Sequence, residues 1–520
     1  MNHHSIQSKI VPALAATLLL SPLAALHAAE SSKPNIIFVM PDDVGSGDYA
    51  CLGNPIVRTP SVDAFKKQSL AFMQFHVSPT CSPCRSSLMS GRHEFKNGVT
   101  HTILERERMT LKTFTLPQML KTAGYTSGIF GKWHLGDEEA YRPESRGFDE
   151  VYIHGGGGIG QTYPGSCGDA PGNTNINPAL WHNGKWEKTT GYCTDLFFAQ
   201  AIQWMNAKRE AKQPFFAYIP LNAAHGPHVV PGEYYKHYVG KSGVSEQTAK
   251  FLGMIENVDT NFGKLLAKLK EWGIEDNTLV IYITGDNGGT AGTKIFNAGL
   301  HGGKGTPYQG GTRATAFFRW PGGKIPAGVE CDALSAHLDI FPTLAELTGA
   351  KLSDEVRQQV EGRSLLPLLT HPKADWPDRA LVHHVGRWGK GKAADSKYAK
   401  CAIQNSRFTL VNNTELYDLK ADPGETKNVL AEHPEVVATL RAAYDKWWDE
   451  VQPMLVNENV TNIPKINPLK ELYWKQFGGG PDEAILRKMD PTKGAGGEGN
   501  PTKKAERKKR KEAKPEDPKQ

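Results

Sequence analysis

The sequence predicts an α/β fold with a large, mixed but mostly parallel sheet sandwiched by helices, and a smaller C-terminal antiparallel sheet with a helix. Up to about residue 375, short apolar runs rich in β-branched and aromatic residues alternate with stretches of helical periodicity, as in βαβ units. Beyond that point the apolar runs become shorter and follow one another closely, which favours antiparallel pairing. A chain of 520 residues is long enough for one large domain and a smaller one.

Individual elements follow from the same patterns. Buried strands of the large sheet are predicted at 34–40, 125–130, 214–221 and 278–284. Helices are predicted at 113–124, which ends at a glycine, and at 247–272. The smaller sheet is predicted to contain 408–411 and 415–419, with a helix at 434–448. These elements predict a large domain over 30–375, which would carry the active site, and a smaller α+β domain over 376–490.

The first 29 residues are predicted to be a signal peptide. Lys9 precedes an apolar stretch that closes with A-L-H-A-A, and cleavage is expected after Ala28 or Ala29. A transmembrane anchor is the alternative, but Pro12 and Pro22 leave too short an unbroken apolar run. We therefore expect an exported protein, periplasmic or secreted, without a membrane span.

The net charge of +6 arises mainly at the C-terminal end. Residues 503–520 contain nine Lys or Arg and four Asp or Glu, and a Gly-rich stretch precedes them. A basic disordered tail is therefore predicted over 491–520. It could dock on a polyanion, although a solvated tail is the simpler interpretation, and no nucleic-acid partner is expected.

Seven cysteines are an odd number for an exported chain, so at least one is unpaired or chemically altered. Cys167 and Cys193 flank a region with many Gly, Asn and Pro residues, and a disulfide between them is the most reasonable pairing. Cys81 and Cys84 stand in the run C-S-P-C-R. This pair could be a redox pair, half of a zinc site, or a place where one cysteine is modified.

Polar side chains follow all four predicted strands of the large sheet, at the edge where ligands bind in open α/β sheets. One group offers hard oxygen ligands, which suit Ca²⁺ or Mg²⁺ rather than zinc: Asp42, Asp43, Asp286 and Asn287. A second group is cationic or proton-donating, which suits a tetrahedral anion: Lys132, His134, His225 and Lys304. Each residue alone would be an ordinary turn or surface residue. Together they predict sulfuryl or phosphoryl transfer.

From about Pro34 to Val429, the chain resembles the formylglycine-dependent sulfatases (type I, Cys-type) of the alkaline phosphatase superfamily. The family signature C-x-P-x-R is present as C-S-P-C-R at residues 81–85, followed by L-M-S-G-R. Other matching stretches are P-N-I-I-F-V-M-P-D-D, Y-T-S-G-I-F-G-K-W-H-L-G, I-T-G-D-N-G, G-G-K-G-T-P-Y-Q-G-G-T-R and E-L-Y-D-L-K-A-D-P-G-E-T-K-N. The resemblance implies an alkaline phosphatase-like fold and arylsulfatase-like hydrolysis of sulfate esters.

The resemblance also implies that a separate maturation enzyme oxidises Cys81 to formylglycine. The hydrated aldehyde has two hydroxyls on one carbon: one would attack sulfur and expel the alcohol, and deprotonation of the other would release sulfate. Ca²⁺, in preference to Mg²⁺, would be held by the modified Cys81 together with Asp42, Asp43, Asp286 and Asn287.

Further roles follow from the same resemblance. Arg85 would orient the hydrate, and Lys132 and Lys304 would bind the sulfate oxygens. His134 would be the base of the elimination step, and His225 would contact the substrate and protonate the leaving alkoxide. His301, where relatives often carry arginine, is expected to contact the substrate.

Several alternatives stay open from the sequence. A Cys81–Cys84 disulfide would prevent modification of Cys81. A phosphodiesterase or phosphonate monoester hydrolase of the same superfamily would use a similar site. A secreted glycan-binding protein with a vestigial site is an alternative of another class, against which the complete set of ligands and acid–base groups argues.

A sulfated carbohydrate is the leading substrate hypothesis. The loop-rich 140–195 region contains aromatic side chains that could line a sugar subsite, as does the neighbourhood of Trp376 and Trp388. The candidates in the first region are His154, Tyr163, Trp181 and Trp186. A role in core or loop packing is at least as good an interpretation for each of them.

Overall fold

The computed structural model describes Met1 and residues 33–161, 168–461, 463–464 and 466–480. The predicted signal peptide, the tail after residue 480 and Cys167 lie outside the described residues. Within the described part of the chain, no helix is both long and apolar enough to cross a membrane.

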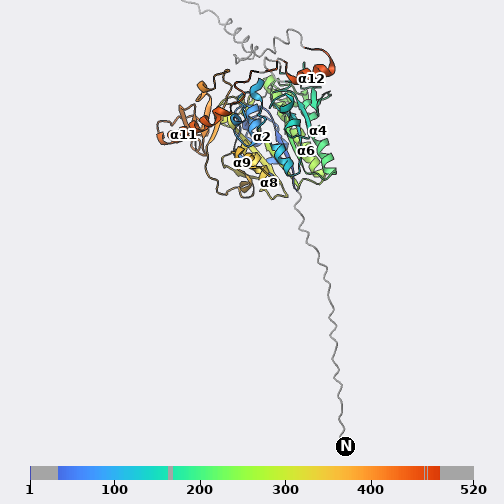
Figure 1. Ribbon diagram of the computed structural model, residues 1–520, viewed down its shortest axis with the longest axis horizontal. Coiled ribbons are helices and arrows are strands. Elements are labelled where there is room, and N and C mark those ends of the chain that lie inside the picture. The colour runs from blue at the N-terminus through green and yellow to red at the C-terminus, as the bar shows by residue number, and fades with distance from the viewer. Residues whose placement is uncertain (2–32, 162–167, 462, 465, 481–520) are drawn as a thin grey trace, which may run out of the picture. The chain divides into compact units, whose positions relative to one another are not determined.

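An 11-stranded mixed sheet forms the centre of the structure (Figure 1). Its strands run in the order β10 (Val329–Cys331), β2 (Leu70–His76), β9 (Arg313–Arg319), β8 (Thr278–Ile283), β1 (Asn35–Met40), β7 (Phe215–Pro220), β3 (Thr126–Lys132), β4 (Glu150–His154), β5 (Ala179–His182) and β6 (Lys185–Lys188), with β11 (Ser335–Ala336) beside β2. The strands from β8 to β4 pair in parallel, whereas β9 and the β5–β6 hairpin pair antiparallel. The predicted large mixed sheet is confirmed.

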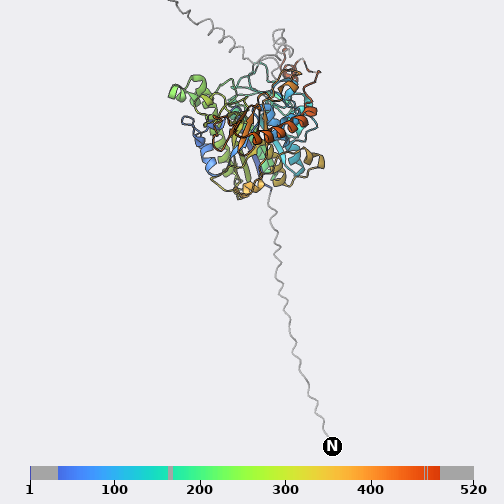
Figure 2. The same cartoon turned by 90° about the vertical axis from the view of Figure 1, so that its left-hand side faces the viewer.

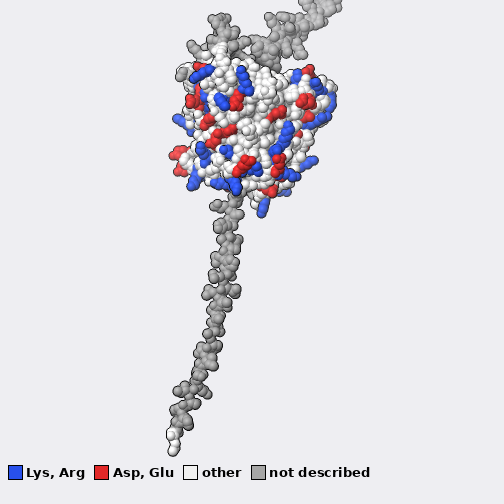
Figure 3. Space-filling model, turned by 90° about the vertical axis from the view of Figure 1, so that its right-hand side faces the viewer, with Lys and Arg blue, Asp and Glu red and all other residues white. Residues whose placement is uncertain are grey.

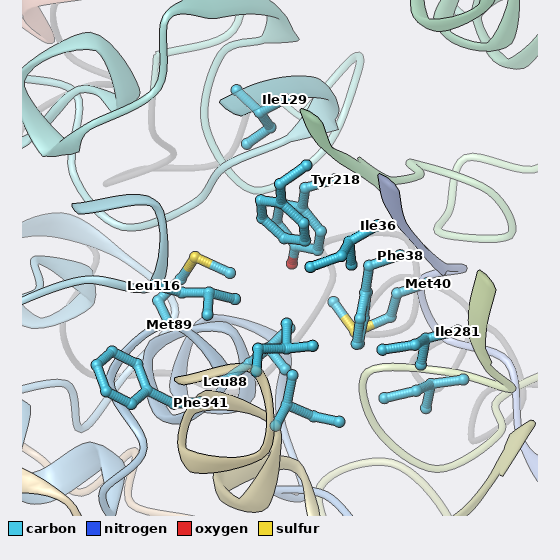
Figure 4. Packing of buried hydrophobic residues seen from close by; sticks show 14 of the residues in the cluster. Ile36, Phe38, Met40, Leu88, Met89, Leu116, Ile129, Tyr218, Ile281 and Phe341 are labelled. Carbon is cyan, nitrogen blue, oxygen red and sulfur yellow. The ribbon is translucent and has the colours of Figure 1, made fainter. Parts of the chain in front are cut away.

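Helices cover both faces of the sheet because its central strands alternate their apolar side chains. In β1, Ile36, Phe38 and Met40 point to one face, and Ile37 and Val39 point to the other. The first face packs on α2 (Cys81–Ser90), α3 (Leu116–Thr122) and α8 (Ile340–Thr348), as the close view in Figure 4 shows for α2. The second face packs on α1 (Pro60–Lys67), α4 (Cys193–Glu210) and α6 (Glu246–Glu271). Two cores result, one on each face.

The predicted strands of the large sheet correspond to β1, β3, β7 and β8, and the two predicted helices to α3 and α6. Sequence reasoning did not identify β2 and β9. These two strands pair antiparallel with one another, and β2 has a register shift between Phe72 and Phe75 that breaks a regular pattern.

A second sheet of four antiparallel strands lies toward the C-terminus: β12 (Leu381–His384), β13 (Cys401–Gln404), β14 (Phe408–Val411) and β15 (Glu415–Asp418). Helix α11 (Pro434–Val451) packs against it, and Figure 2 shows this helix from the side that faces the solvent. Phe95, from the part of the chain before α3, is buried in the same apolar cluster. The predicted small sheet and its helix are therefore confirmed, and Phe95 connects them to the rest of the molecule.

Candidate active site

Four neighbouring parallel strands bring the predicted site residues to one edge of the sheet. β8, β1, β7 and β3 lie side by side in this order, so their carboxyl ends are adjacent. Asp286 and Asn287 follow β8, and Asp42 and Asp43 follow β1. His225 follows β7, Lys132 ends β3, and His134 comes two residues later.

Helix α2 begins with Cys81 and delivers it to this edge. All ten residues of α2 are buried, and Thr80 precedes the helix with extended backbone. Arg85 lies one turn further on, on the same face as Cys81. Its Nε and Nη2 donate to Oδ2 of Asp286 at 2.9 and 2.7 Å, and its Nη1 donates to the carbonyl of Lys132 at 3.0 Å. The guanidinium thus joins the ends of β8 and β3 to the start of α2.

A buried cluster of oxygen and sulfur ligands lies between these strands. One ligand atom each from Asp42, Cys81 and Asp286 lies within 4.8 Å of the other two. Among the described residues, Oδ1 of Asp42 and Oδ1 of Asn287 are buried without a hydrogen-bond partner. The amide of Asn287 donates to Oδ1 of Asp43 at 3.1 Å, which leaves its oxygen directed elsewhere.

The charges of this cluster favour the binding of a cation. Burial, and then repulsion from Asp286, raise the pKa of Asp42 well above its usual value despite the nearby Lys132. Burial alone would also raise the pKa of Asp43, but Lys304, followed by His225, holds it well below its usual range. A divalent cation bound among these oxygens would offset the repulsion and give the unpartnered oxygens a ligand, so the donor set fits Ca²⁺.

Two lysines stand beside the cluster. Lys132 forms a buried ion pair with Asp42, and the partly buried Lys304 forms an ion pair with Asp43. The ammonium nitrogen of Lys304 also lies 3.9 Å from Sγ of Cys81. Burial opposes the charge on both lysines, but the attraction of Asp42 and of Asp43, respectively, raises their pKa values. Both therefore remain cationic next to Cys81.

The two predicted histidines are neutral and held by neighbours. Nε2 of His134 lies 2.9 Å from the carbonyl of Thr102 and 3.3 Å from Oε2 of Glu107, and burial lowers its pKa well below the usual value. His134 has φ of 63°, a left-handed conformation that is uncommon for a non-glycine residue. Nε2 of His225 lies 3.8 Å from Oδ2 of Asp43 and 3.3 Å from Nε2 of Gln161, and burial lowers its pKa to about 3.

A glycine run covers both imidazoles. A Cβ on Gly157 would lie 2.7 Å from Nε2 of His134, and one on Gly158 would lie 2.9 Å from Nδ1 of His225. Only glycine lets the chain pass this close without displacing the rings. Sequence reasoning missed this cover and also missed Thr102 and Glu107. The run G-G-G-G at 155–158 was a signal for the cover, because consecutive glycines often mark a close approach of the backbone.

His301 is the predicted site residue without a contact to this cluster. Its side chain is exposed and stacks on Tyr308 with ring centroids 4.0 Å apart. No hydrogen bond or ion pair among the described residues joins its side chain to the other site residues.

The aromatic sugar subsite suggested by the sequence needs correction. Trp181 and Trp186 are 2% and 1% exposed, and the indole N–H of Trp186 donates to the carbonyl of Leu469. His154 and Trp388 are buried as well, while Trp376 is partly buried and packs on the core. Tyr163 lies outside the described residues. Trp181 and Trp186 are buried in one core of the large sheet and Trp388 in the cluster of the small sheet, so these rings are not available to a sugar-binding surface.

The state of the cysteine thiols tests the two disulfides considered from the sequence. Cys81 and Cys84 both have free thiols, so the structure contains no Cys81–Cys84 disulfide. Cys193 is a free, buried thiol near Oδ1 of Asn175, which argues against the predicted pairing with Cys167, a residue outside the described ones. Burial raises the pKa of Cys84 well above its usual value, so it is an inert apolar neighbour of Cys81.

Comparison with known proteins identifies the family. Residues 34–350 match the sulfatase family, and residues 303–448 match the C-terminal domain of N-sulphoglucosamine sulphohydrolase. Human arylsulfatase A (Homo sapiens) is 31% identical over 478 residues, covering 82% of this chain and 89% of the relative. N-acetylgalactosamine-6-sulfatase of Canis lupus familiaris is 30% identical over 418 residues, covering 72% and 74%.

Solved structures agree with this match. The crystal structure of Ps i-CgsB is 28% identical, with a TM-score of 0.71 over 85% of this chain and 97% of that one. The phosphonate monoester hydrolase of Agrobacterium radiobacter is 20% identical with a TM-score of 0.56, a likeness in fold alone. The signature, the site geometry and the family match agree, and the chain belongs to the sulfatase family of sulfuric ester hydrolases.

Proposed function

We propose that the protein hydrolyses a sulfate ester on a carbohydrate, with a formylglycine formed at Cys81 and a bound Ca²⁺ ion. The observation that carries this proposal is the buried group of Asp42, Cys81 and Asp286, whose ligand atoms lie within 4.8 Å of one another. Two cationic lysines next to this group provide the counter-charges that a sulfate needs. An arrangement of this kind would bind the sulfate of the substrate beside the metal.

The donor set supports Ca²⁺ rather than Mg²⁺. Asp42, Asp43, Asp286 and Asn287 would hold the ion together with the modified side chain at position 81. Ca²⁺ accepts several oxygen ligands in irregular geometry, whereas Mg²⁺ prefers to keep several of its waters. The bound ion would supply positive charge to a sulfate oxygen, and formylglycine would supply, as its hydrate, the nucleophilic hydroxyl. We propose that a separate maturation enzyme forms the aldehyde.

The chain's own side chains would bind the ester and move protons. Lys132 and Lys304 would each donate to sulfate oxygens, and Arg85, fixed by Asp286, would keep the side chain at position 81 in one orientation. His134 is neutral, with its ring fixed at Thr102, and therefore can accept a proton.

His225 would give a proton to the leaving alkoxide. Its pKa of about 3 applies to the protein without substrate, where burial is the main cause. An anionic ester bound beside the ring would favour the protonated form and raise the pKa toward the working range of an acid.

The nature of the relatives supports a carbohydrate substrate. One relative, N-acetylgalactosamine-6-sulfatase, and the matched C-terminal domain family of N-sulphoglucosamine sulphohydrolase bear names that refer to sulfated amino sugars. Ps i-CgsB has also been solved in complex with k-i-k-neocarrahexaose, at 28% identity and a TM-score of 0.70 to this chain. His301, exposed in a glycine-rich loop next to Lys304, would contact the sugar. The leader-like N-terminal sequence supports export to the periplasm or the medium.

Hydrolysis of nitrophenyl sulfate and of a panel of sulfated oligosaccharides tests this proposal. Wild-type protein, co-produced with a maturation enzyme, should release sulfate, and Cys81→Ala should lower the rate by about 10³-fold or more because the nucleophile is lost. Cys84→Ser is the matched control: it alters the neighbouring thiol and keeps C-x-P-x-R, so activity should remain. Equal rates for Cys81→Ala and wild type would refute the proposed nucleophile.

A further inference from the structure

Arg387 lies on a short loop directly after β12, where the small sheet meets the segment before α3. Its backbone N–H donates to the carbonyl of Thr100 at 2.9 Å. Gly386, with φ of 62°, approaches Thr100 so closely that a Cβ would lie 2.2 Å from the same carbonyl oxygen. Trp388 follows, and its carbonyl accepts from Arg106 at 2.6 Å. The loop is therefore fixed on both sides of Arg387.

The side chain of Arg387 reaches the neighbourhood of the active site. It is exposed, and Nη2 donates to Oγ1 of Thr102 at 2.9 Å. The carbonyl of the same Thr102 lies 2.9 Å from Nε2 of His134. Arg387 and His134 therefore share Thr102 as a hydrogen-bond partner, and the guanidinium of Arg387 lies on the His134 side of the proposed sulfate site.

Other charged groups on this side already have partners. Nε of Arg106 lies 2.8 Å from Oε1 of Glu458, and Lys390 lies 3.9 Å from Oε1 of Glu105. Glu107 faces His134 at 3.3 Å. The imidazole of His101 is neutral, because burial, and then Arg106, lower its pKa to about 2.

Arg387 differs from these groups. Within the described part of the chain it has no acidic partner at ion-pair distance, and Thr102 is the hydrogen-bond acceptor for one of its terminal nitrogens only. An arginine carries five N–H donors in a planar fork that matches an oxyanion. A fixed, exposed and uncompensated guanidinium beside a pocket for one anion is arranged to bind a second one.

We propose that Arg387 determines substrate specificity by binding a second anionic group, a carboxylate or a further sulfate, on the saccharide that carries the scissile ester. This inference rests on the proposed function, because it places the sulfated sugar at the site of Cys81. The second anion would lie on the same sugar or on its neighbour. Substrates with two anionic groups would then be preferred over those with the scissile sulfate alone.

The test compares matched pairs of saccharides that differ in one anionic group. One pair is a sulfated chondroitin disaccharide and its uronate methyl ester, which removes the carboxylate charge. The other pair is an iota-type and a kappa-type carrageenan oligosaccharide, which differ by one sulfate on a disaccharide. For each pair, kcat/KM is measured with wild type, Arg387→Gln and Arg387→Lys, and binding to Cys81→Ala with and without Arg387→Gln is measured by calorimetry.

In the pair that wild type accepts, Arg387→Gln should lower kcat/KM for the doubly anionic member about 10-fold or more. For the member with one anionic group, kcat/KM should change less than about twofold. Arg387→Lys should fall between wild type and Arg387→Gln, because the charge remains and the fork is lost. The matched control is Arg407→Gln. Arg407 is an exposed arginine directly before β14 whose fork is occupied by Asp418 at 3.0 and 2.7 Å, and the control should leave kcat/KM unchanged for both members.

Equal losses for both members of every pair, or no loss with Arg387→Gln, would overturn the proposal. The pair that responds, carboxylate or sulfate, identifies the second group. Failure of the proposed function gives a different result: no sulfate is released from any saccharide by wild type. In that case the calorimetric arm still decides, because weaker binding confined to the doubly anionic member supports the role of Arg387 and unchanged binding contradicts it.

Discussion

Arg85 illustrates how one side chain organises the site. Three of its N–H groups bond to Asp286 and to the carbonyl of Lys132, and the side chain is 1% exposed. A buried carboxylate of this kind needs its partner, because an unpaired charge in the interior is strongly unfavourable. The fork therefore fixes both a predicted metal ligand and the helix that carries Cys81.

Arg85→Lys should lower kcat/KM about 100-fold. Lysine keeps the charge but cannot reproduce the fork, and each lost charged hydrogen bond contributes about 1.5–3 kcal/mol. Arg379→Lys is the matched control, because Arg379 forms a similar fork with the buried Asp339. Arg379→Lys should lower the Tm and leave kcat/KM within about twofold. A similar kinetic loss in both variants would show that the effect of Arg85 is one of stability only.

At the scale of elements, the strand ends position the ligands, and the turns after them are tightly packed. A Cβ on Gly285, between β8 and Asp286, would lie 1.9 Å from the carbonyl oxygen of Val44, which follows Asp43. The turns after β8 and β1 therefore touch through their backbones, and this contact sets the spacing of their carboxylates.

Gly285→Ala should accordingly reduce activity below detection and destabilise the protein by about 2–4 kcal/mol, a cost typical of overpacking and backbone strain. Urea unfolding and sulfate release measure the two effects. Gly389→Ala serves as the control, since its Cβ would meet only the Lys392 side chain at 3.7 Å and its φ is not left-handed. Wild-type behaviour of Gly285→Ala would contradict the close packing of the two turns.

The junction between the sheets contains three buried histidines: His76 at the end of β2, His337, and His383 in β12. The rings of His76 and His383 lie 5.4 Å apart, and Nε2 of His337 lies 3.0 Å from Oγ of Ser78. Burial lowers the pKa of His337 to about 4 and of His383 to about 3, and holds that of His76 well below its usual value. The folded protein therefore keeps these rings neutral.

Stability should fall as the pH decreases from about 6.5 toward 4. The unfolded chain binds protons at these histidines near pH 6.5, whereas the folded chain does not. Each histidine therefore lowers the free energy of unfolding by up to about 1.4 kcal/mol per pH unit in this window. Urea unfolding between pH 7 and pH 5 measures the slope, and His383→Asn should reduce it. The exposed His371, changed to Asn, should leave the slope as it is. An unchanged slope in His383→Asn would exclude this histidine as a source.

Much of the site could be predicted from the sequence because its residues follow strands. The apolar runs before Asp42, Lys132, His225 and Asp286 were regular, and parallel strands bring such residues to one edge. The partners of His134 could not be predicted, because Thr102 and Glu107 lie in an irregular segment that precedes both α3 and β3 in the sequence. Their positions depend on tertiary packing.

The aromatic residues show the opposite case. Trp181 and Trp186 lie in a region whose sequence indicated exposed loops. The sequence could not show that α12 (Pro468–Phe477) supplies the carbonyl of Leu469 as the acceptor for Trp186. Burial by a distant segment is decided only when the whole chain folds. The small sheet was predicted, but its contribution of Arg387 to the neighbourhood of the site was not.

At the scale of the whole molecule, the charges of the active site are gathered inside the protein. On the face shown in Figure 3, basic and acidic side chains are interspersed without one dominant sign. At the sheet edge, the buried carboxylates and Lys132 lie together with the partly buried Lys304. We therefore expect the stability of the whole protein to depend on the cation that we propose for this site.

Removing Ca²⁺ with a chelator should lower the Tm by several degrees, and restoring it should reverse the change. A ligand at 100 times its Kd stabilises the folded state by about 2.7 kcal/mol. Asn287→Ala should reduce this Ca²⁺-dependent rise, and Mg²⁺ should produce a smaller rise than Ca²⁺. Differential scanning calorimetry measures the shift, and identical Tm values with chelator and with Ca²⁺ would contradict a calcium site.

The state of Cys81 in the active protein is the most direct test of the account. Peptide mass spectrometry of the tryptic fragment 68–85 should show an aldehyde in place of the Cys81 thiol in a preparation that hydrolyses sulfate esters, with Cys84 unchanged. An intact Cys81 thiol, or a Cys81–Cys84 disulfide, in an equally active preparation would contradict the account.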